Sequence, residues 1–357
     1  MPNWHQNLKR PGVTTCSQEN RAECILHEIP SGRNTEQMTT PKFVLTAPNH
    51  CIINGVLGPH HTLVTGAEGF IGRWVRSRLL SAGRNVISLD QKSNSTTPGI
   101  FYACDVTDPR QLQEIFRAHK FNSIVHLASL LPTASKQNPQ AATQVNIAGT
   151  LNILEAARNF QVPRIVYASS LSVYGSSGAS DTVSEISPTA PEDLYGAAKK
   201  YAEALGEAYA CNHGIQFTAL RISTVLGPGA TGTASPWRSQ LFDFLGDQRS
   251  CEISIPYRPD EILSMVHVED LADVFAILLD AKQTAFSAYN VPSEIWQLSD
   301  LGKEIQVLNN NIRITFGDLR VTGFPRQISS DRFRTEFNYK PTSLKERLNR
   351  ARQRTPA

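Results

Sequence analysis

Residues 62–72 read Thr-Leu-Val-Thr-Gly-Ala-Glu-Gly-Phe-Ile-Gly, and this stretch decides the fold. It opens on apolar and β-branched residues, which predict a short buried strand. The segment Arg73–Ala82 that follows has a helical pattern. Three glycines therefore stand in the turn between a strand and a helix. Gly66 permits the tight turn, Gly69 lets the backbone approach a ligand, and Gly72 allows close packing of the helix.

Such a turn directs backbone N–H groups and the positive end of a helix dipole at one point, which suits the pyrophosphate of a dinucleotide. The next predicted strand, residues 85–90, ends in Asp90. A carboxylate there accepts hydrogen bonds from an adenosine ribose and repels a 2′-phosphate. The sequence therefore predicts NAD and disfavours NADP. A cation at Arg73, Arg84 or Lys92 would offset that repulsion and keeps NADP as the minor alternative.

Tyr195 and Lys199 form a second informative pair, because their i, i+4 spacing places both on one face of a helix predicted over Leu194–His213. A nearby ammonium favours the phenolate, so we expect the pKa of Tyr195 to fall from about 10 towards neutrality. Upstream, a predicted strand over Arg164–Ala168 leads to Ser170, whose hydroxyl follows the end of the strand, where open α/β sheets bind ligands. We predict that Ser170, Tyr195 and Lys199 are catalytic, with Tyr195 as the acid/base.

Predicted strands and helices alternate through residues 61–225, which indicates an α/β fold with a Rossmann-type, doubly wound parallel sheet. Further helices are predicted over Pro109–His119 and Pro139–Phe160, and a further strand over Gln216–Leu220. A fourth strand is predicted over Ile124–Ser129, and His126 inside it is interpreted as a core residue. Residues at the glycine turn and at strand ends border one crevice, so we expect cofactor contacts from Gly66, Gly69, Phe70, Ile71, Gly72, Asp90, Asp105, Val106, Leu127, Ala128, Ser129, Tyr195 and Lys199.

These segments, in this order, resemble the extended short-chain dehydrogenase/reductase family, also called the NAD-dependent epimerase/dehydratase family. The resemblance covers residues 61–350 and rests on Thr65–Gly72, Asp90, Asp105-Val106, His126–Ser129, Val145-Asn146, Gly149-Thr150, Ser169–Gly175, Tyr195–Lys199, Leu220-Arg221, Gly227-Pro228, Val266–Asp270 and Phe337–Pro341. It implies that Tyr195 moves the proton, that Lys199 binds the nicotinamide ribose and that Ser170 hydrogen-bonds the reacting oxygen. It also implies direct hydride transfer to or from nicotinamide, and it adds Asn146 to the expected cofactor contacts.

The chain departs from the family pattern where the substrate is concerned. Leu171 and Ser172 stand where a 4,6-dehydratase carries an acidic pair, so dehydration is disfavoured. Leu263 stands where many sugar-nucleotide epimerases carry an arginine that holds the phosphates, so strong charge-assisted bonds are missing there. Three other arginines are candidates for that role: Arg258, Arg320 and Arg326.

Two enzyme functions therefore stay open: an epimerase that retains NAD and acts on a sugar or sugar nucleotide, and a net dehydrogenase of a free sugar acid or hydroxy acid. Residues 130–132 and 233–238 resemble the branch that acts on free hydroxy acids. A non-catalytic NAD(H)-binding protein is the third alternative, against which the intact catalytic trio argues. Substrate contacts are expected at Leu131, Ser172, Thr224 and Arg238.

The 357-residue chain carries a net charge of +3 and 40% hydrophobic residues, and its length suggests about two domains. Residues 1–60 lack apolar periodicity and are predicted to form a disordered extension. Residues 61–225 are predicted to form the NAD-binding domain, and residues 226–350 a substrate-binding lobe interleaved with it.

The composition of the chain limits the binding partners and the cellular location that we expect. No apolar run long enough for a membrane span is present, and charges of both signs are interspersed, so neither a membrane nor a nucleic acid is expected as a partner. The six cysteines fit neither a zinc pattern nor a disulfide framework, so we expect no metal and a cytoplasmic protein. Alanine-rich helices over Ala141–Ala157 and Tyr195–Tyr209 predict a homodimer, in line with the family resemblance.

Overall fold

The computed structural model describes residues 60–92, 98–177, 182–230, 235–247 and 249–353. Its largest sheet is parallel and has the strand order β11-β7-β5-β4-β1-β2-β3. The strands are β1 (His61–Thr65), β2 (Val86–Asp90), β3 (Ile100–Ala103), β4 (Phe121–His126), β5 (Arg164–Ser170), β7 (Gln216–Ile222) and β11 (Ala288–Asn290). Chain order reverses between β1 and β4, which is the point where such sheets open a ligand crevice. The predicted Rossmann-type fold is confirmed, whereas the predicted amino-terminal extension lies outside the described residues.

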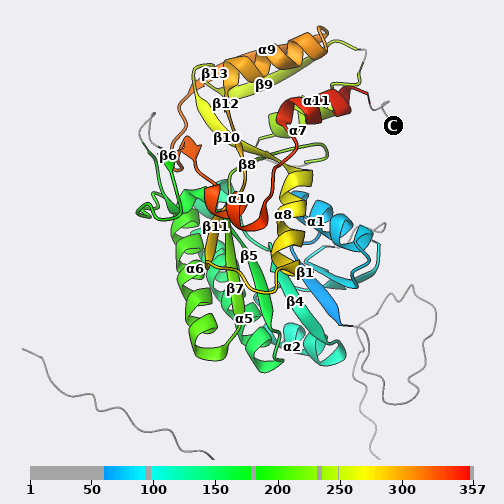
Figure 1. The fold of residues 1–357 in the computed structure, drawn as a ribbon, viewed down its shortest axis with the longest axis vertical. Coiled ribbons are helices and arrows are strands. Elements are labelled where there is room, and N and C mark those ends of the chain that lie inside the picture. The colour runs from blue at the N-terminus through cyan, green and yellow to red at the C-terminus, as the bar shows by residue number, and fades with distance from the viewer. Residues whose placement is uncertain (1–59, 93–97, 178–181, 231–234, 248, 354–357) are drawn as a thin grey trace, which may run out of the picture. The chain divides into compact units, whose positions relative to one another are not determined.

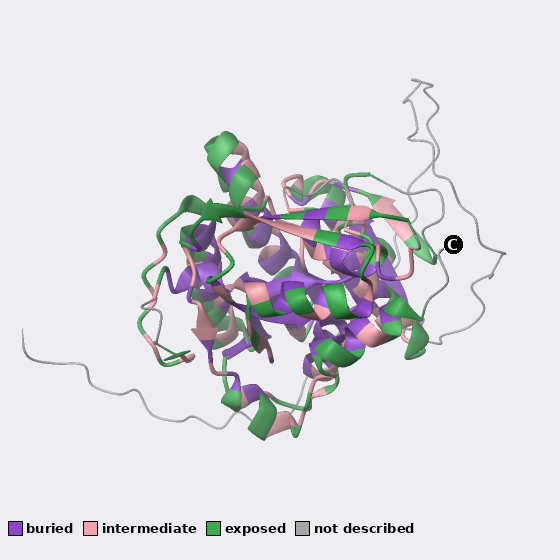
Figure 2. Cartoon of the chain, turned by 90° about the horizontal axis from the view of Figure 1, so that it is seen from above, coloured by how far each residue is buried: buried purple, intermediate pink, exposed green. Residues whose placement is uncertain are grey.

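Helices cover both faces of this sheet (Figure 1). One face carries α2 (Pro109–Ala118), α5 (Thr150–Asn159) and α6 (Leu194–His213), and the other carries α1 (Phe70–Ser81) and α8 (Val268–Asp280). The two faces bury separate hydrophobic clusters, and Figure 2 shows the strands between the layers mostly in the buried colour. Apolar strands buried on both sides explain why their sequences read as continuous hydrophobic runs.

The predicted bounds of α6 match the structure, because its caps are local. The Asp193 side chain accepts a hydrogen bond from Gly196 N at the start, and Gly214 ends the helix at φ +69. The predicted helix over Pro139–Phe160 is continuous, but it contains a π-helical turn over Gln144–Gly149 between α4 (Pro139–Thr143) and α5. One expectation was wrong: β4 ends at His126, so residues 127–129 lie in the connection after the strand.

The remaining elements build three smaller sheets, ordered β12-β10-β8, β13-β9 and β14-β6. The strands of these sheets are β6 (Thr182–Val183), β8 (Thr224–Leu226), β9 (Cys251–Tyr257), β10 (Ile262–His267), β12 (Glu294–Gln297), β13 (Ile312–Leu319) and β14 (Gln327–Ile328). The remaining α-helices are α3 (Pro132–Gln137), α7 (Trp237–Asp243), α9 (Leu298–Leu308), α10 (Asp331–Phe337) and α11 (Leu344–Arg352). Trp237, Leu301 and Leu348 are buried in one cluster that joins α7, α9 and α11. Because β8 follows β7 after a single residue, this second core is connected directly to the large sheet.

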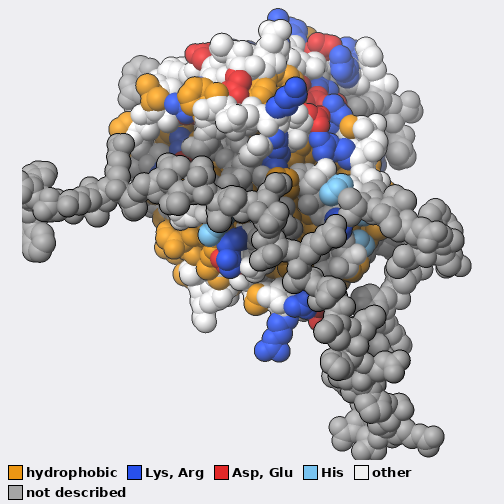
Figure 3. Space-filling model, turned by 60° about the horizontal axis from the view of Figure 1, so that its bottom comes forward, with side chains coloured by type: hydrophobic (Ala, Val, Ile, Leu, Met, Phe, Trp, Pro, Cys, Tyr) orange, Lys and Arg blue, Asp and Glu red, His pale blue; other side chains and the backbone are white. Residues whose placement is uncertain are grey.

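The surface carries charges of both signs. On the face drawn in Figure 3, Lys and Arg side chains lie among Asp, Glu and uncharged residues rather than in a stripe of one sign. Among the described residues no helix has the length and apolar character needed to span a membrane.

His126 is a core residue, as the sequence analysis interpreted it. Thr65 Oγ1 accepts hydrogen bonds from the main chain at Leu127 and therefore directs its own proton to His126 Nδ1, 2.7 Å away. His126 Nε2 lies 3.1 Å from Thr150 Oγ1, whose proton goes to Asn146 O. The imidazole thus carries its proton on Nε2. Burial, with Lys199 nearby, lowers the pKa of His126 to about 3.

The pKa of His126 is lowered in the folded state, so below pH 6.5 the unfolded chain binds a proton that the native protein does not. The free energy of unfolding therefore decreases as the pH is lowered. We expect wild type to lose about 2 kcal/mol more than His126→Gln between pH 7 and pH 5, measured by urea unfolding. His213→Gln, at an exposed histidine, should keep the wild-type pH dependence. Equal pH dependence in wild type and His126→Gln would contradict this.

Candidate active site

The glycine turn has the close backbone approach that the sequence predicted. Gly66 has φ +66, and a Cβ there would lie 2.8 Å from Ala128 N, in the connection that follows β4. A Cβ on Gly72 would lie 2.1 Å from Gly66 O, so only glycine lets α1 begin against the turn. The first turn of α1 opens at Phe70 with Gly69 as its N-cap, and no side chain caps it. Free N–H groups at a cradle of this kind fit the pyrophosphate of a dinucleotide.

Asp90 lies beside that turn. One of its carboxylate oxygens accepts a hydrogen bond from Glu68 N at 3.0 Å, and the other accepts one from Gln91 N at 2.8 Å. Gln91 Nε2 donates to Asp105 at 2.8 Å, which draws the ends of β2 and β3 together. Val106 is buried next to Asp105 and would contact a Cβ placed on Gly149. These side chains border one edge of the sheet, as predicted for the adenosine end of NAD.

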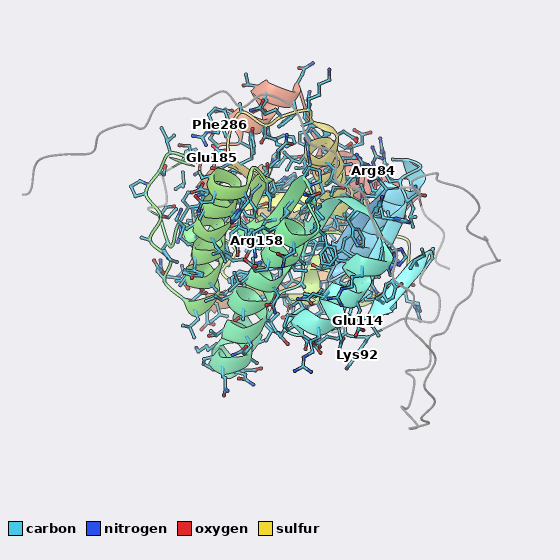
Figure 4. All side chains as sticks on the ribbon, turned by 90° about the horizontal axis from the view of Figure 1, so that it is seen from below. Arg84, Lys92, Glu114, Arg158, Glu185 and Phe286 are labelled. Carbon is cyan, nitrogen blue, oxygen red and sulfur yellow. The ribbon has the colours of Figure 1, made fainter. Side chains whose placement is uncertain are left out.

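Arg84 was wrong as a candidate for a 2′-phosphate. It precedes β2, pairs with Asp280 and reaches Thr62 at the start of β1, so it lies at the opposite edge of the sheet from Asp90. Figure 4 shows Arg84 well apart from Lys92, which follows β2 and is exposed. Arg73 donates to Gly229 O at 2.6 Å. Of the three candidate cations for a 2′-phosphate, only Lys92 and Arg73 therefore lie on the same side of the sheet as Asp90.

The three predicted catalytic residues come together at the carboxyl edge of the sheet. Ser170 ends β5, and its hydroxyl accepts a hydrogen bond from Ser172 N at 3.1 Å and also hydrogen-bonds Tyr195. Tyr195 and Lys199 lie in the first turns of α6 and are both buried. A Cβ on Gly196 would lie 2.4 Å from Ser172 O, so this glycine lets α6 approach the end of β5.

Lys199 points past the phenol. Its Nζ donates to Ala168 O at 2.7 Å and lies 4.8 Å from the centre of the Tyr167 ring and 5.4 Å from that of Tyr195. Aromatic faces attract a cation, so the two rings and the carbonyl hold the ammonium in place. Nζ is thus close to the place where Ser170 and Tyr195 meet, without a direct bond to either among the described contacts.

The expected fall in the pKa of Tyr195 was wrong for the protein alone. Burial raises the pKa of Tyr195 to about 12, and the hydrogen bond from Ser170 only partly opposes this. Burial also lowers the pKa of Lys199 to about 7, against the attraction of Glu203. Both groups are desolvated, so burial disfavours the charged form of each and is the largest cause of both shifts.

A buried ion pair that was not predicted supports this arrangement. Arg221 on β7 donates to both carboxylate oxygens of Glu203 on α6, at 2.9 and 2.8 Å, and Ser169 Oγ donates to the same carboxylate at 2.6 Å. Burial alone would raise the pKa of Glu203, but Arg221 outweighs it and the pKa lies below its ordinary value. Arg221 also donates to Tyr174 Oη at 2.8 Å, which donates to Asn290 on β11.

The signal for this pair was present in the sequence. Glu203 follows Lys199 by one helical turn, on a face of α6 that also carries Ala198, Ala202 and Gly206, and Arg221 interrupts an apolar strand. Charged residues are rarely fully buried unless they are paired, so each predicts an opposite charge nearby. Which residue supplies the opposite charge depends on the pairing of β5 with β7, and the periodicity of the sequence does not predict that pairing.

Asn146 lies in the π-helical turn and holds the segment after β4. Its Oδ1 accepts hydrogen bonds from Leu130 N at 2.8 Å and Ser129 Oγ at 3.0 Å, and its Nδ2 donates to Leu130 O at 3.0 Å. Leu127 and Ala128 lie between this anchor and Gly66. Short π-helical segments often accompany functional sites, and this one directs a buried amide at the crevice.

The four predicted substrate contacts are distributed unequally. Ser172 lies beside the three residues that are predicted to be catalytic, and its Oγ is 3.2 Å from Ser170 Oγ. Leu131 is 60% exposed just before α3, and Thr224 is buried at the start of β8. Arg238 lies on α7, and its main-chain oxygen accepts a hydrogen bond from Gly227 N. The described contacts do not join Leu131, Thr224 or Arg238 to Ser170 directly.

The strand order and the glycine turn define a Rossmann-type fold whose turn has the form of a dinucleotide-binding site. The model of the NAD dependent epimerase/dehydratase family matches residues 62–291. The match covers more than half of the chain, so the protein belongs to this family, the extended short-chain dehydrogenase/reductases, as its motifs predicted.

Relatives and solved structures agree with this assignment. The chain is 33% identical over 193 residues to a UDP-glucuronate 4-epimerase of Thermodesulfobacterium geofontis, covering 49% of this chain and 59% of the relative. It thus spans about half the length of the curated relatives it matches. Two structures share the fold: L-threonine dehydrogenase from Phytophthora infestans (TM-score 0.74, 24% identity, 82% of this chain and 98% of that one) and UDP-glucose 4-epimerase from Thermus thermophilus with NAD (0.70, 22%, 81% and 96%).

Glu203→Gln keeps the shape of the side chain but leaves the Arg221 cation buried without its counter-charge. We expect it to lower the free energy of unfolding by about 3–5 kcal/mol, measured by urea unfolding. Lys200→Ala removes a half-exposed partner 3.5 Å from the same carboxylate and should cost less than about 1 kcal/mol. Similar losses in the two variants would show that the pair with Arg221 is not the stabilising contact.

Proposed function

We propose that this protein is an NAD-dependent oxidoreductase that transfers a hydride at a hydroxyl-bearing carbon of a sugar or sugar nucleotide, with Tyr195 as the acid/base. The observation that carries the proposal is the meeting of Ser170, Tyr195 and Lys199 at the edge of the sheet that also bears the glycine turn. Membership of the NAD dependent epimerase/dehydratase family supports NAD as the cofactor.

Each residue has a distinct task in this proposal. The substrate hydroxyl would lie against Tyr195, which exchanges its proton, and the hydroxyl of Ser170, which lies beside the phenol, would hydrogen-bond the same substrate oxygen. Lys199 would hold the nicotinamide ribose. NAD, when bound, supplies the hydride acceptor and a positive charge near the phenol. Tyr195 is protonated at neutral pH in the protein alone, so it is ready to act as an acid; its action as a base needs positive charge from Lys199 and the cofactor.

The cofactor contacts follow the same edge. The turn from Gly66 to Gly72, with Phe70 and Ile71, would hold the pyrophosphate, and Asp90 the adenosine ribose. Asp105 and Val106 would lie beside the adenine, and the segment 127–129, anchored by Asn146, beside the cofactor between its two ends.

A specific observation favours a second candidate, the net dehydrogenase of a free sugar acid or hydroxy acid. Leu263 is 1% exposed in the core of the lobe, so β10 offers no arginine for nucleotide phosphates at this position. Leu171 and Ser172 follow Ser170 in a 3-10 turn without a carboxylate, which speaks against a 4,6-dehydratase. Purified protein that releases NADH on addition of a sugar acid is a dehydrogenase; one that interconverts sugar nucleotides without net NADH release is an epimerase.

A cytoplasmic homodimer belongs to the same proposal. Exposed apolar side chains at Leu151 on α5 and at Leu194 and Tyr201 on α6 support pairing through these two helices. The alternative of a non-catalytic NAD(H)-binding protein is disfavoured by the complete catalytic trio.

Tyr195→Phe should lower kcat by about 10²- to 10⁴-fold and leave NAD affinity nearly unchanged, because it removes only the hydroxyl that exchanges the proton. Steady-state kinetics and NAD titration measure the two effects. Tyr201→Phe, on the same helix at an exposed tyrosine, is the matched control and should behave as wild type. Activity above about half of the wild-type value in Tyr195→Phe would remove Tyr195 from the mechanism.

Asp90→Ala should relax the preference for NAD over NADP, because it removes a carboxylate that repels a 2′-phosphate. The ratio of kcat/KM for the two cofactors measures this. Asp318→Ala removes an equal charge from an exposed position on β13 and should leave the ratio unchanged. A wild type that already prefers NADP would show that Asp90 does not select the cofactor.

A further inference from the structure

The glycine turn carries a buried ion pair that the sequence pattern did not predict. Glu68 stands between Gly66 and Gly69, and its carboxylate accepts a hydrogen bond from the guanidinium of Arg76 on α1. The two side chains are each 9% exposed. Charged side chains are rarely withdrawn from water to this degree unless they are paired. The ion pair is therefore part of the structure of the turn and not a solvated surface contact.

The main chain around Glu68 is joined to the end of β2. Glu68 N donates to Asp90 Oδ2 at 3.0 Å, and Ala67 N donates to Leu89 O at 3.2 Å. The turn is thus attached to the last two residues of β2, where the adenosine ribose of NAD is expected. A single glutamate side chain separates the hydrogen bond to Asp90 from the guanidinium of Arg76.

Arg76 approaches β2 from the face of the sheet to which Asp90 belongs. Ile87 and Leu89 pack in the cluster on the side of α2 and α5, whereas Val86 packs in the cluster on the side of α1 and α8. Side chains alternate between the two faces of a strand, so Asp90 shares the face of Val86. Arg76 is buried on α1, which covers this face. The cation and the Asp90 carboxylate therefore lie on the same side of β2.

Arg76 differs from the two cations that remain as candidates for a 2′-phosphate. Lys92 is exposed, and Arg73 donates to Gly229 O at 2.6 Å. Of the three cations, Arg76 is the one that described hydrogen bonds connect to Asp90, through Glu68. Its charge is already balanced by the Glu68 carboxylate.

The ion pair determines how the turn interacts with anions. An unpaired carboxylate at the start of α1 would repel the phosphates of a dinucleotide, and an unpaired guanidinium would attract them. When they are paired, the two charges nearly cancel at the pyrophosphate, which is then bound by main-chain N–H groups. Next to the pair, a 2′-phosphate on the adenosine ribose would meet two carboxylates, Glu68 and Asp90, with the Arg76 cation already neutralised.

We propose that Glu68 determines cofactor specificity, because it holds the Arg76 guanidinium in a buried ion pair beside Asp90 and thereby favours NAD over NADP. A guanidinium presents a planar fork of donors that matches a phosphate, so Arg76 without Glu68 would bind the 2′-phosphate that the pair excludes. Glu68 thus acts both by its own negative charge and by occupying the cation. The inference deepens the proposed function and rests on it for NAD as the cofactor.

The test compares the dissociation constants of NAD and NADP, measured by calorimetric titration of the full chain freed of bound nucleotide. Glu68→Gln removes the negative charge with little change of shape and leaves Arg76 without its counter-charge. We expect NADP to bind this variant about 10- to 100-fold more tightly than wild type, as for a gained charge-assisted contact, and NAD affinity to change by less than about 3-fold. Glu252→Gln, at an exposed glutamate on β9, is the matched control and should bind both cofactors as wild type.

A second pair of variants shows whether the freed cation causes the gain. Arg76→Met leaves the Glu68 carboxylate unpaired in the turn, so both cofactors should bind several-fold more weakly, NADP by the larger factor. The double variant Glu68→Gln/Arg76→Met lacks both charges and should lose the gain in NADP affinity. If Glu68→Gln does not fold, Arg76→Met still decides, because wild-type affinities in that variant would overturn the inference.

Two adenosine fragments locate the effect at the ribose. Adenosine 2′,5′-bisphosphate should show the same gain with Glu68→Gln as NADP, whereas 5′-AMP should bind wild type and variant alike. An unchanged preference in folded Glu68→Gln, or a gain that persists in the double variant, would overturn the inference.

The titrations also separate this inference from the proposed function, because they involve no turnover. A wild type that binds NAD, with Glu68→Gln keeping the wild-type preference, overturns the role of Glu68 and leaves the proposed function standing. A wild type that binds neither cofactor overturns both.

Discussion

The carboxylate of Glu203 is the contact on which the catalytic edge depends. It accepts hydrogen bonds from Ser169 on β5 and Arg221 on β7 while it stands one turn after Lys199 on α6. Three elements that meet only through tertiary pairing are thereby fixed at one point. A buried ion pair of this kind adds little net stability over an apolar core, but a charge without its partner is strongly disfavoured. The pair therefore penalises every arrangement in which α6 lies elsewhere on the sheet.

The same burial that fixes the site also sets its chemistry. Tyr195 and Lys199 lie in one dry region, where burial raises the pKa of the phenol to about 12 and lowers that of the lysine to about 7. Neither charged form is favoured in the protein alone, so positive charge brought by the cofactor has a large effect on both groups. In the proposed mechanism, proton transfer at Tyr195 would thus be coupled to cofactor binding, because charge brought by the cofactor acts strongly in a region of low dielectric.

The sequence predicted what local chemistry determines. Caps at Asp193 and Gly214 define α6, and the glycine spacing with its apolar strand defines the turn before α1, so the Rossmann-type fold and the place of the catalytic trio followed. What it did not predict depends on long-range pairing. The partners Glu203 and Arg221 lie on different elements, and the acidity of Tyr195 depends on how completely neighbouring chains cover it. No periodicity encodes either property.

Cofactor and substrate specificity consequently have different origins in this chain. The expected cofactor site lies mostly within residues 62–106, where the turn and the strand ends can be predicted from consecutive segments of the sequence. The lobe is assembled from segments far apart in sequence, since β8, β10 and β12 form one sheet and β9 pairs with β13. The environment of a side chain on these segments is therefore determined only when that assembly forms. Family membership therefore bears more directly on the proposed role of Tyr195, which lies in a shared motif, than on the substrate, whose expected contacts lie mostly outside those motifs.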